Sequence, residues 1–202
     1  MKIAVIYYSA TGTNYQLAKW AAQGAEAEGA TVRLLKLKET APTEAIASNP
    51  AWLAHRTETS EIPEITHEDL IWADGLIFSF PTRFGNIPSQ LSNFLDTCGG
   101  IWFAGKLTNK VVSAMTSAGN PHGGQEATLL SFYVTMFHWG TIIASPGFTH
   151  DAVYKAGGNP YGTTATAGPD GILNDAQDAA IHQGQRTAQV TRYIKIGLET
   201  TK

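Results

Sequence analysis

The chain has 202 residues, a length that favours one domain over two. Its hydrophobic content of 43% and aromatic content of 10% exclude a disordered chain, and its charged content of only 15% indicates much buried contact surface. A net charge of −3, with no two basic residues in succession, argues against nucleic-acid binding, and no apolar stretch approaches the roughly 18 residues of a membrane span.

Apolar segments alternate with helical segments along the chain. Residues 2–8 form a continuous run of β-branched and aromatic residues, which predicts a buried strand, and leucine and alanine then recur at helical spacing over 15–29. The remaining predicted elements are a strand at 31–37, a short helix ending at 70–74, a strand at 75–80, a helix at 88–98, a strand at 110–117, a helix at 125–139, a strand at 141–145 and a helix at 175–198. Five buried strands alternating with helices predict a single α/β domain, a doubly wound parallel sheet with helices on both faces.

Small residues form a stripe along the last predicted helix. Ala180, Gly184, Ala188 and Thr191 recur at helical spacing. A surface without bulky side chains allows close backbone approach, so we expect this helix to lie close against the sheet.

Two connections are too long to be simple turns. They span residues 38–66 and 146–174. Loops of this length in a compact domain are usually functional or form contacts between subunits. The second is rich in Gly, Thr and Pro, and we expect contacts to order it without regular secondary structure.

Polar residues follow the first predicted strand, at the edge of an α/β sheet where ligands bind. They are Ser9, Ala10, Thr11, Gly12, Thr13 and Asn14. Hydroxyls, an amide and a glycine at a helix start favour an anion site, and the absence of Lys and Arg between Lys2 and Lys19 means neutral donors would hold the anion. The loop lacks the glycines of a dinucleotide fingerprint and the lysine of a Walker A motif, so a phosphomonoester is favoured over a pyrophosphate. The alternative is simple capping of the helix by Thr13 or Asn14.

Two further strand-end loops carry candidate binding groups. After the third strand come Pro81, Thr82, Arg83, Phe84, Gly85 and Asn86, and after the fourth come Ser117, Ala118, Gly119, Asn120, Pro121, His122 and Gly123. The first of these displays an aromatic ring and a guanidinium, which favours a functional role over a turn before the next helix. Glycine in the second allows close approach to a planar ligand, although a long turn without a ligand is the simpler interpretation.

An aromatic cluster lies between Gly100 and Gly105. It contains Ile101, Trp102 and Phe103 in a predicted loop. Such a cluster is most often local core, and the alternative is an aromatic wall over a flat ligand or a contact between subunits.

Other chemistries find no support in the sequence. The six histidines show no close ligand spacing, so no metal site is predicted, and no Gly-x-Ser-x-Gly motif of an α/β-hydrolase occurs. The single cysteine, Cys98, lacks an activating neighbour and is interpreted as a small buried residue. A lone thiol and the absence of a signal-peptide pattern predict a cytoplasmic protein.

With these loops in place, the sequence resembles the WrbA-type NAD(P)H:quinone oxidoreductases, which are flavodoxin-like FMN enzymes. The resemblance covers nearly the whole chain. The motifs that carry it are Tyr7-Tyr8-Ser9 with Gly12, Pro81-Thr82-Arg83-Phe84-Gly85-Asn86, Phe94-Leu95-Asp96 with Gly99-Gly100-Ile101-Trp102, Gly123-Gly124-Gln125-Glu126, and Gly157-Gly158-Asn159-Pro160-Tyr161-Gly162.

The resemblance implies a five-stranded sheet of order 2-1-3-4-5 and one FMN per subunit of a homotetramer, with sites near subunit interfaces. It places the phosphate at residues 9–14, the isoalloxazine edge at 82–84 and its other side at 117–123. It brings His138 to the flavin as a proton donor and makes Trp102 a wall for nicotinamide and quinone. Thr11 stands where the family commonly has a tyrosine near the nucleotide.

The implied activity is transfer of two electrons from NADH or NADPH to a quinone by a ping-pong mechanism. In this reading the protein supplies positioning and electrostatics, and the cofactor supplies the redox chemistry. The alternative is a flavodoxin-like one-electron carrier with a protein redox partner. Such carriers are usually strongly acidic, which a net charge of −3 does not match.

Overall fold

The computed structural model describes residues 1–200 of the chain. Its strands are β1 (Lys2–Tyr7), β2 (Thr31–Lys36), β3 (Gly75–Pro81), β4 (Val111–Ala118), β5 (Ile142–Ile143), β6 (Thr164–Gly168) and β7 (Gly171–Ile172). Its helices are α1 (Thr13–Ala27), α2 (Thr43–Ala47), α3 (Pro50–Glu58), α4 (His67–Trp72), α5 (Ser89–Asp96), α6 (Gly99–Phe103), α7 (Gln125–His138), α8 (Asp151–Lys155) and α9 (Gln177–Thr200). Within the described range, no helix is both long and apolar enough to cross a bilayer.

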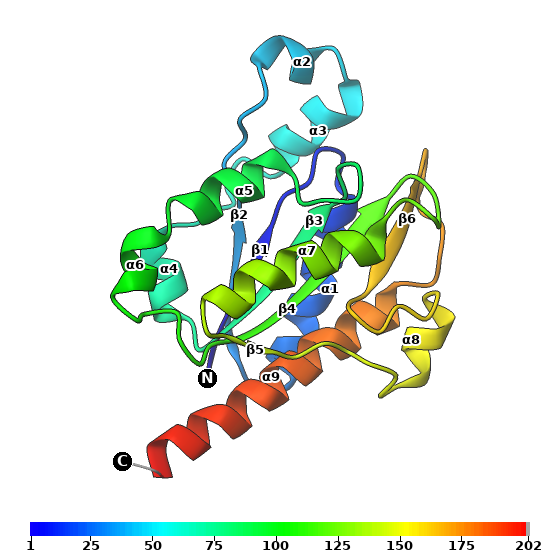
Figure 1. Cartoon of the computed structure of the whole chain (residues 1–202). Helices are drawn as coiled ribbons and strands as arrows, with labels where there is room; N and C mark the ends of the chain where they lie inside the picture. The colour runs from blue at the N-terminus through cyan, green and yellow to red at the C-terminus, as the bar shows by residue number, and fades with distance from the viewer. Residues whose placement is uncertain (201–202) are drawn as a thin grey trace.

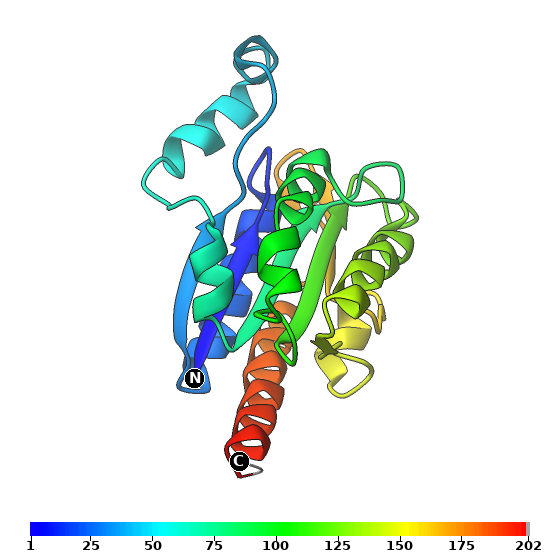
Figure 2. The same ribbon diagram turned by 60° about the vertical axis from the view of Figure 1, so that its left-hand side comes forward.

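The central sheet has the order β2-β1-β3-β4-β6-β7, with β5 also paired to β4. Every pairing is parallel except that of β6 with β7. Helices α4, α5 and α7 cover one face, and α1 and α9 cover the other (Figures 1 and 2). The predicted doubly wound parallel sheet is therefore confirmed, including the order 2-1-3-4 of its first four strands.

The fifth strand position is divided between two short strands. β5 pairs with Val111 and Val112 at the start of β4, whereas β6 pairs with Thr116, Ser117 and Ala118 at its end. The predicted strand at 141–145 is therefore shortened to two residues. Pro146 lacks an N–H group and restricts the residue before it, so the chain leaves the ladder there and returns at Thr164.

Strand β1 is buried on both faces, as its continuous apolar run predicts. Ile3, Val5 and Tyr7 pack toward α1 and α9, while Ala4 and Ile6 pack toward α4, α5 and α7. This alternation places the end of β1, and the loop that follows it, at the centre of the carboxyl edge of the sheet.

The small-residue stripe of α9 packs against both α1 and the sheet, so the expected close approach to the sheet is confirmed and α1 is a second neighbour. A β-carbon added to Gly184 would lie 2.0 Å from the carbonyl oxygen of Ala21. Ala180 and Ala188 share a buried cluster with Ile77 of β3 and Met115 of β4, and Thr191 lies against Gly75 of β3.

Both long connections contain regular structure. Residues 38–66 carry α2 and α3, which form an arm projecting beyond the carboxyl edge of the sheet (Figure 2). The expectation that 146–174 lacks regular structure is wrong, because α8, β6 and β7 lie there. The side chain of Asn174 organises this segment: it accepts from Thr166 N and donates to the carbonyls of Ala156 and Thr164.

The aromatic cluster after α5 is helical, and not the predicted loop. It forms α6, in which Trp102 N donates to Cys98 O at 3.0 Å. Gly105, with φ of +68°, ends the helix in a backbone conformation that glycine adopts readily.

Candidate functional site

Residues of all three predicted strand-end loops line one cleft of about 170 Å³. The lining residues are Ser9, Ala10, Thr11, Thr13, Asn14, Pro81, Thr82, Arg83, Ser117, Ala118, Gly119 and Ala167. The loops converge because β1, β3 and β4 are adjacent and parallel, so their carboxyl ends share one edge. Ala167 lies outside the three predicted loops, on β6 in the long connection 146–174.

The first loop leads into α1 without a side-chain cap. Gly12 occupies the cap position with φ of +97°, and no side-chain oxygen of the described residues caps the helix start. Capping by Thr13 or Asn14 is therefore not what these residues do. An uncapped helix start next to three cleft-lining hydroxyl residues, Ser9, Thr11 and Thr13, leaves backbone N–H groups available to an anion.

Asn14 holds the first loop to the two neighbouring strands. Its Nδ2 donates to Ser79 Oγ on β3 at 3.2 Å, and Ser117 Oγ on β4 donates to its Oδ1 at 2.6 Å. Ser79 Oγ also donates to the Asn14 carbonyl at 2.8 Å. All three side chains are buried, so each hydrogen bond fixes loop geometry without competition from water.

The second loop is a tight turn that presents an exposed ring. Arg83 and Asn86 exchange two backbone hydrogen bonds, and Phe84 between them has φ of +53°. The Phe84 side chain is fully exposed, and the Arg83 guanidinium donates to the Thr82 carbonyl. Only Pro81, Thr82 and Arg83 of this loop line the cleft. The ring of Phe84 is therefore available to a ligand or to another subunit.

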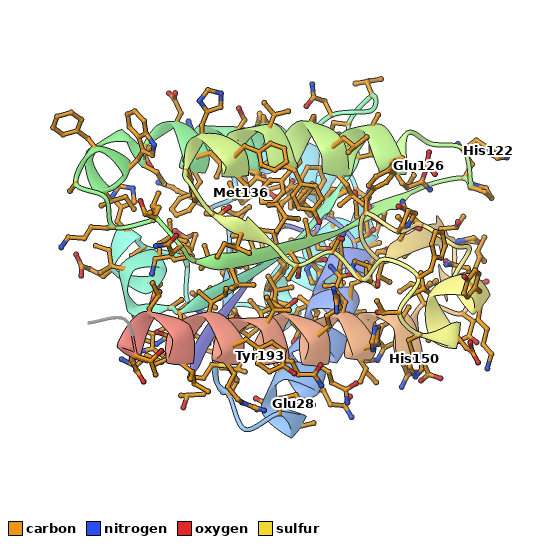
Figure 3. All side chains as sticks on the ribbon, turned by 60° about the horizontal axis from the view of Figure 1, so that its bottom comes forward. Glu28, His122, Glu126, Met136, His150 and Tyr193 are labelled. Atoms are coloured by element: carbon orange, nitrogen blue, oxygen red, sulfur yellow. The ribbon has the colours of Figure 1, made fainter. Side chains whose placement is uncertain are left out.

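The third predicted loop is divided between two places. Ser117 and Ala118 belong to β4 and line the cleft together with Gly119. Asn120, Pro121, His122 and Gly123 are not among the cleft-lining residues. Asn120 organises this turn, since its Oδ1 accepts from His122 N and its carbonyl from Gln125 Nε2. His122 projects from the outer end of the loop (Figure 3).

Trp102 and His138 lie together at the other edge of the sheet. Trp102 Nε1 donates to the His138 carbonyl at 2.7 Å, and Gly140 near the end of α7 pairs with Asn109 before β4 begins. Helix α7 starts beside the cleft and has 14 residues, so its ends are about 20 Å apart. Neither residue is among those that line the cleft. The Trp102 side chain is 47% exposed, which does not fit the local-core interpretation.

One carboxylate, that of Glu39, gathers several hydrogen bonds that hold the arm beside the cleft. Glu39 accepts from the Tyr8 hydroxyl at 3.2 Å, from Trp52 Nε1 at 3.1 Å and from Gln90 Nε2 at 3.0 Å. Burial raises the pKa of Tyr8, and the Glu39 charge adds to that shift. These contacts link α3, β1 and α5, and no local sequence pattern predicted them.

Comparison with known proteins gives concordant results. A family model described as NADPH-dependent FMN reductase matches residues 1–152. Two curated relatives are named NAD(P)H dehydrogenase (quinone). The relative from Deinococcus radiodurans is 47% identical, and the alignment covers 95% of this chain and 96% of the relative. The relative from Azorhizobium caulinodans is 40% identical, and the alignment covers 93% of this chain and 96% of the relative.

Solved structures similar to this chain have the flavodoxin fold. A flavodoxin, WrbA-like protein from Agrobacterium tumefaciens superposes with a TM-score of 0.62 at 21% identity, covering 95% of this chain and 98% of that one. A flavodoxin from the domain Archaea gives 0.61 at 14% identity and covers 95% and 99%. The predicted flavodoxin-like fold is confirmed.

Proposed function

The chain belongs to the NADPH-dependent FMN reductase family, and from this premise we propose that it is an FMN-dependent oxidoreductase that passes two electrons from NADH or NADPH to a quinone. The curated relatives support this proposal by name, in agreement with the WrbA-type resemblance of the sequence. The observation that carries it is the cleft at the uncapped start of α1, which Asn14 joins to β3 and β4.

The residues of the cleft suit FMN. Backbone N–H groups at the start of α1, with the hydroxyls of Ser9, Thr11 and Thr13, would hold a phosphomonoester. Thr82 and Arg83 would lie along one edge of the isoalloxazine and residues 117–119 along the other. Pro121 and His122, which line a separate cavity, would at most border the ring. When bound, FMN supplies the redox chemistry by accepting two electrons from the nicotinamide and giving them to the quinone.

The protein's own contribution is binding, orientation and charge. The guanidinium of Arg83 places a positive charge at the cleft, where it would compensate negative charge on a bound ligand. The buried Asn14 network keeps the phosphate loop rigid, so that a cofactor anchored there has one orientation. One pocket that serves nicotinamide and quinone in turn gives a ping-pong mechanism.

We further propose a homotetramer in which a neighbouring subunit completes the pocket. Leu130, Val134 and Phe137 form an exposed apolar stripe along α7, and the exposed Trp102 and Phe103 lie beside the end of that helix. Exposed apolar surface of this extent indicates a protein contact. Because Trp102 and His138 lie far from the cleft of their own subunit, they would reach a flavin only across such a contact.

We also propose that the protein acts in the cytoplasm. Burial raises the pKa of the Cys98 thiol to about 11, so the single cysteine stays protonated and unreactive. A free thiol of this kind fits a reducing compartment.

Cofactor identity and steady-state kinetics test the proposed function. Mass spectrometry of the released cofactor should find FMN, because the first loop lacks the glycines that accommodate the pyrophosphate of FAD. Quinone-dependent oxidation of NADH or NADPH should give parallel double-reciprocal lines, as one pocket used twice requires. FAD in the preparation, or no quinone-dependent turnover, would contradict the proposal.

Trp102→Ala should leave the melting temperature and FMN content near wild type, because the side chain is half exposed. If the ring walls a neighbour's pocket, loss of its stacking removes about 1 kcal/mol of binding and raises KM for quinone or nicotinamide several-fold. Steady-state kinetics and light scattering of the active protein check the expected rise in KM. Tyr193→Ala, which removes an exposed aromatic ring on α9, is the control. Early unfolding with unchanged KM would identify Trp102 as a packing residue, and an active monomer would contradict the shared pocket.

A further inference from the structure

A buried histidine of the arm lies against the first loop. His55, on α3, has only 6% of its surface exposed. Its Nδ1 lies 3.7 Å from the position that a β-carbon on Gly12 would occupy, next to the start of α1. Glycine allows this approach in two ways, since it has no side chain and readily adopts φ of +97°.

The His55 ring is held by aromatic contacts and not by hydrogen bonds of its nitrogens. Its centroid lies 5.4 Å from that of Tyr15 on α1 and 6.4 Å from that of Tyr7 on β1. Nδ1 is buried without a hydrogen-bond partner anywhere in the described part of the chain. Leaving a buried nitrogen unsatisfied costs stability, so an orphan at this place indicates that something else satisfies or charges it.

Charged groups on three elements face this ring. They are Lys19 on α1, Lys36 on β2 and Glu58 on α3. Both lysines have other contacts: Lys36 Nζ donates to the Thr59 carbonyl at 2.6 Å, and Lys19 Nζ lies over the ring of Tyr15. Burial lowers the pKa of His55, Glu58 opposes that shift, and Lys36 and Lys19 add to it. Without a ligand, His55 is therefore neutral at pH 7.

We propose that His55 is the cationic partner of the FMN phosphate, acting across Gly12 as a positioning residue that takes up one proton from solvent when the phosphate binds. The proposal rests on the proposed FMN site and adds to it a residue outside the predicted loops. The first loop contains no Lys or Arg, and Arg83, the cation that lines the cleft, is assigned to the isoalloxazine edge, so the loop itself offers a dianionic phosphate no cation. A buried imidazole beside Gly12 supplies one only when the phosphate is present.

The sign of the resulting pH dependence follows from linkage. A phosphate dianion raises the pKa of His55 in the complex above its value in the free protein. Between the two values, binding takes up a proton, and FMN affinity therefore increases as pH falls. The change is about tenfold for each unit by which the phosphate raises the pKa. The phosphate itself begins to protonate near pH 6, so the window above that pH is the informative one.

The test is a titration of FMN-free full-length protein with FMN and, separately, with riboflavin, in which quenching of flavin fluorescence reports binding. The titrations cover about pH 6.5 to 8.5, because the phosphate itself protonates below this range. In the wild type, FMN affinity should rise on the order of tenfold toward the lower pH, whereas riboflavin affinity should stay constant. His55→Phe keeps the aromatic contacts and removes the charge, so its FMN affinity should be independent of pH. Calorimetry in two buffers of different ionisation enthalpy should find proton uptake in the wild type and none in the variant.

Two further variants keep the result interpretable. His55→Gln replaces His55→Phe if the phenylalanine does not fold, and should likewise remove proton uptake. His182→Phe, on α9, is the control at another partly buried histidine and should retain the wild-type pH dependence. Persistence of proton uptake in both His55 variants, or its loss in His182→Phe, would overturn the assignment while leaving FMN binding intact. Failure of the wild type to bind FMN at any pH would overturn the proposed function as well.

Discussion

Gly184→Ala should lower the free energy of unfolding by about 3 kcal/mol, because the added methyl group overpacks a contact between two backbones. Its β-carbon would lie 2.0 Å from the carbonyl oxygen of Ala21 and 2.8 Å from the carbonyl carbon, so no side chain can move aside. Gly24 on α1 makes the reciprocal contact with the carbonyl of Ile181 on α9. Either the two helices separate or the backbone distorts.

Gly197→Ala is the matched control on the same helix. Among residues 1–200 a β-carbon there meets no atom within 4 Å, so the gain in helix propensity should raise stability by up to about 1 kcal/mol. Urea unfolding followed by circular dichroism compares the two variants with the wild type. An unchanged midpoint for Gly184→Ala, or a large loss for Gly197→Ala, would contradict the close packing of α1 and α9.

Asn14→Ala should weaken both the fold and the FMN site. The substitution leaves the Ser117 hydroxyl without its acceptor and removes the amide donor to Ser79 Oγ, which keeps its bond to the carbonyl of residue 14, at a cost of about 2–3 kcal/mol. Because the phosphate loop is then no longer fixed to β3 and β4, we expect FMN affinity to fall by more than about tenfold, since even 1.4 kcal/mol of lost binding corresponds to that factor.

Asn14→Asp and Asn93→Ala separate the two effects. The aspartate keeps an acceptor for Ser117 but brings negative charge to the phosphate site, so FMN affinity should fall further than stability. Asn93 is exposed on α5, and its removal should change neither quantity. Thermal melts and FMN titrations on the same preparations give both values. Wild-type FMN affinity in Asn14→Ala would show that the network does not support the site.

Local patterns in the sequence were sufficient for the sheet and for the centre of the site. A buried parallel strand is a continuous apolar run, so β1, β3 and β4 and the polar residues after them were predictable. Since parallel strands share one carboxyl edge, the meeting of Ser9, Thr82 and Ser117 in one cleft followed from the strand order.

Features that depend on contacts distant in sequence were not predictable. The return of the chain to the sheet as β6 depends on Asn174, whose bonds reach from the end of α8 to β6. The arm's place beside the cleft depends on Glu39, which collects donors from three elements. No local sequence pattern around Asn174 or Glu39 indicates these contacts.

Trp102 and His138 illustrate a different limit. The family resemblance associates both with the flavin, yet the structure places them at the opposite edge of the same subunit. A sequence motif does not say which subunit's site a residue serves. The contact between copies along α7 therefore stays a prediction that the oligomeric state and the Trp102 variant test.

Anaerobic reduction and reoxidation of the purified protein test the central claim most directly. Stoichiometric NADH or NADPH should bleach the visible flavin absorbance in a single two-electron step, and addition of a quinone should restore it with release of the hydroquinone. These half-reactions should occur separately, in the order that a ping-pong mechanism requires. Accumulation of a stable one-electron form, together with no recovery on addition of quinone, would contradict the account and indicate a one-electron carrier.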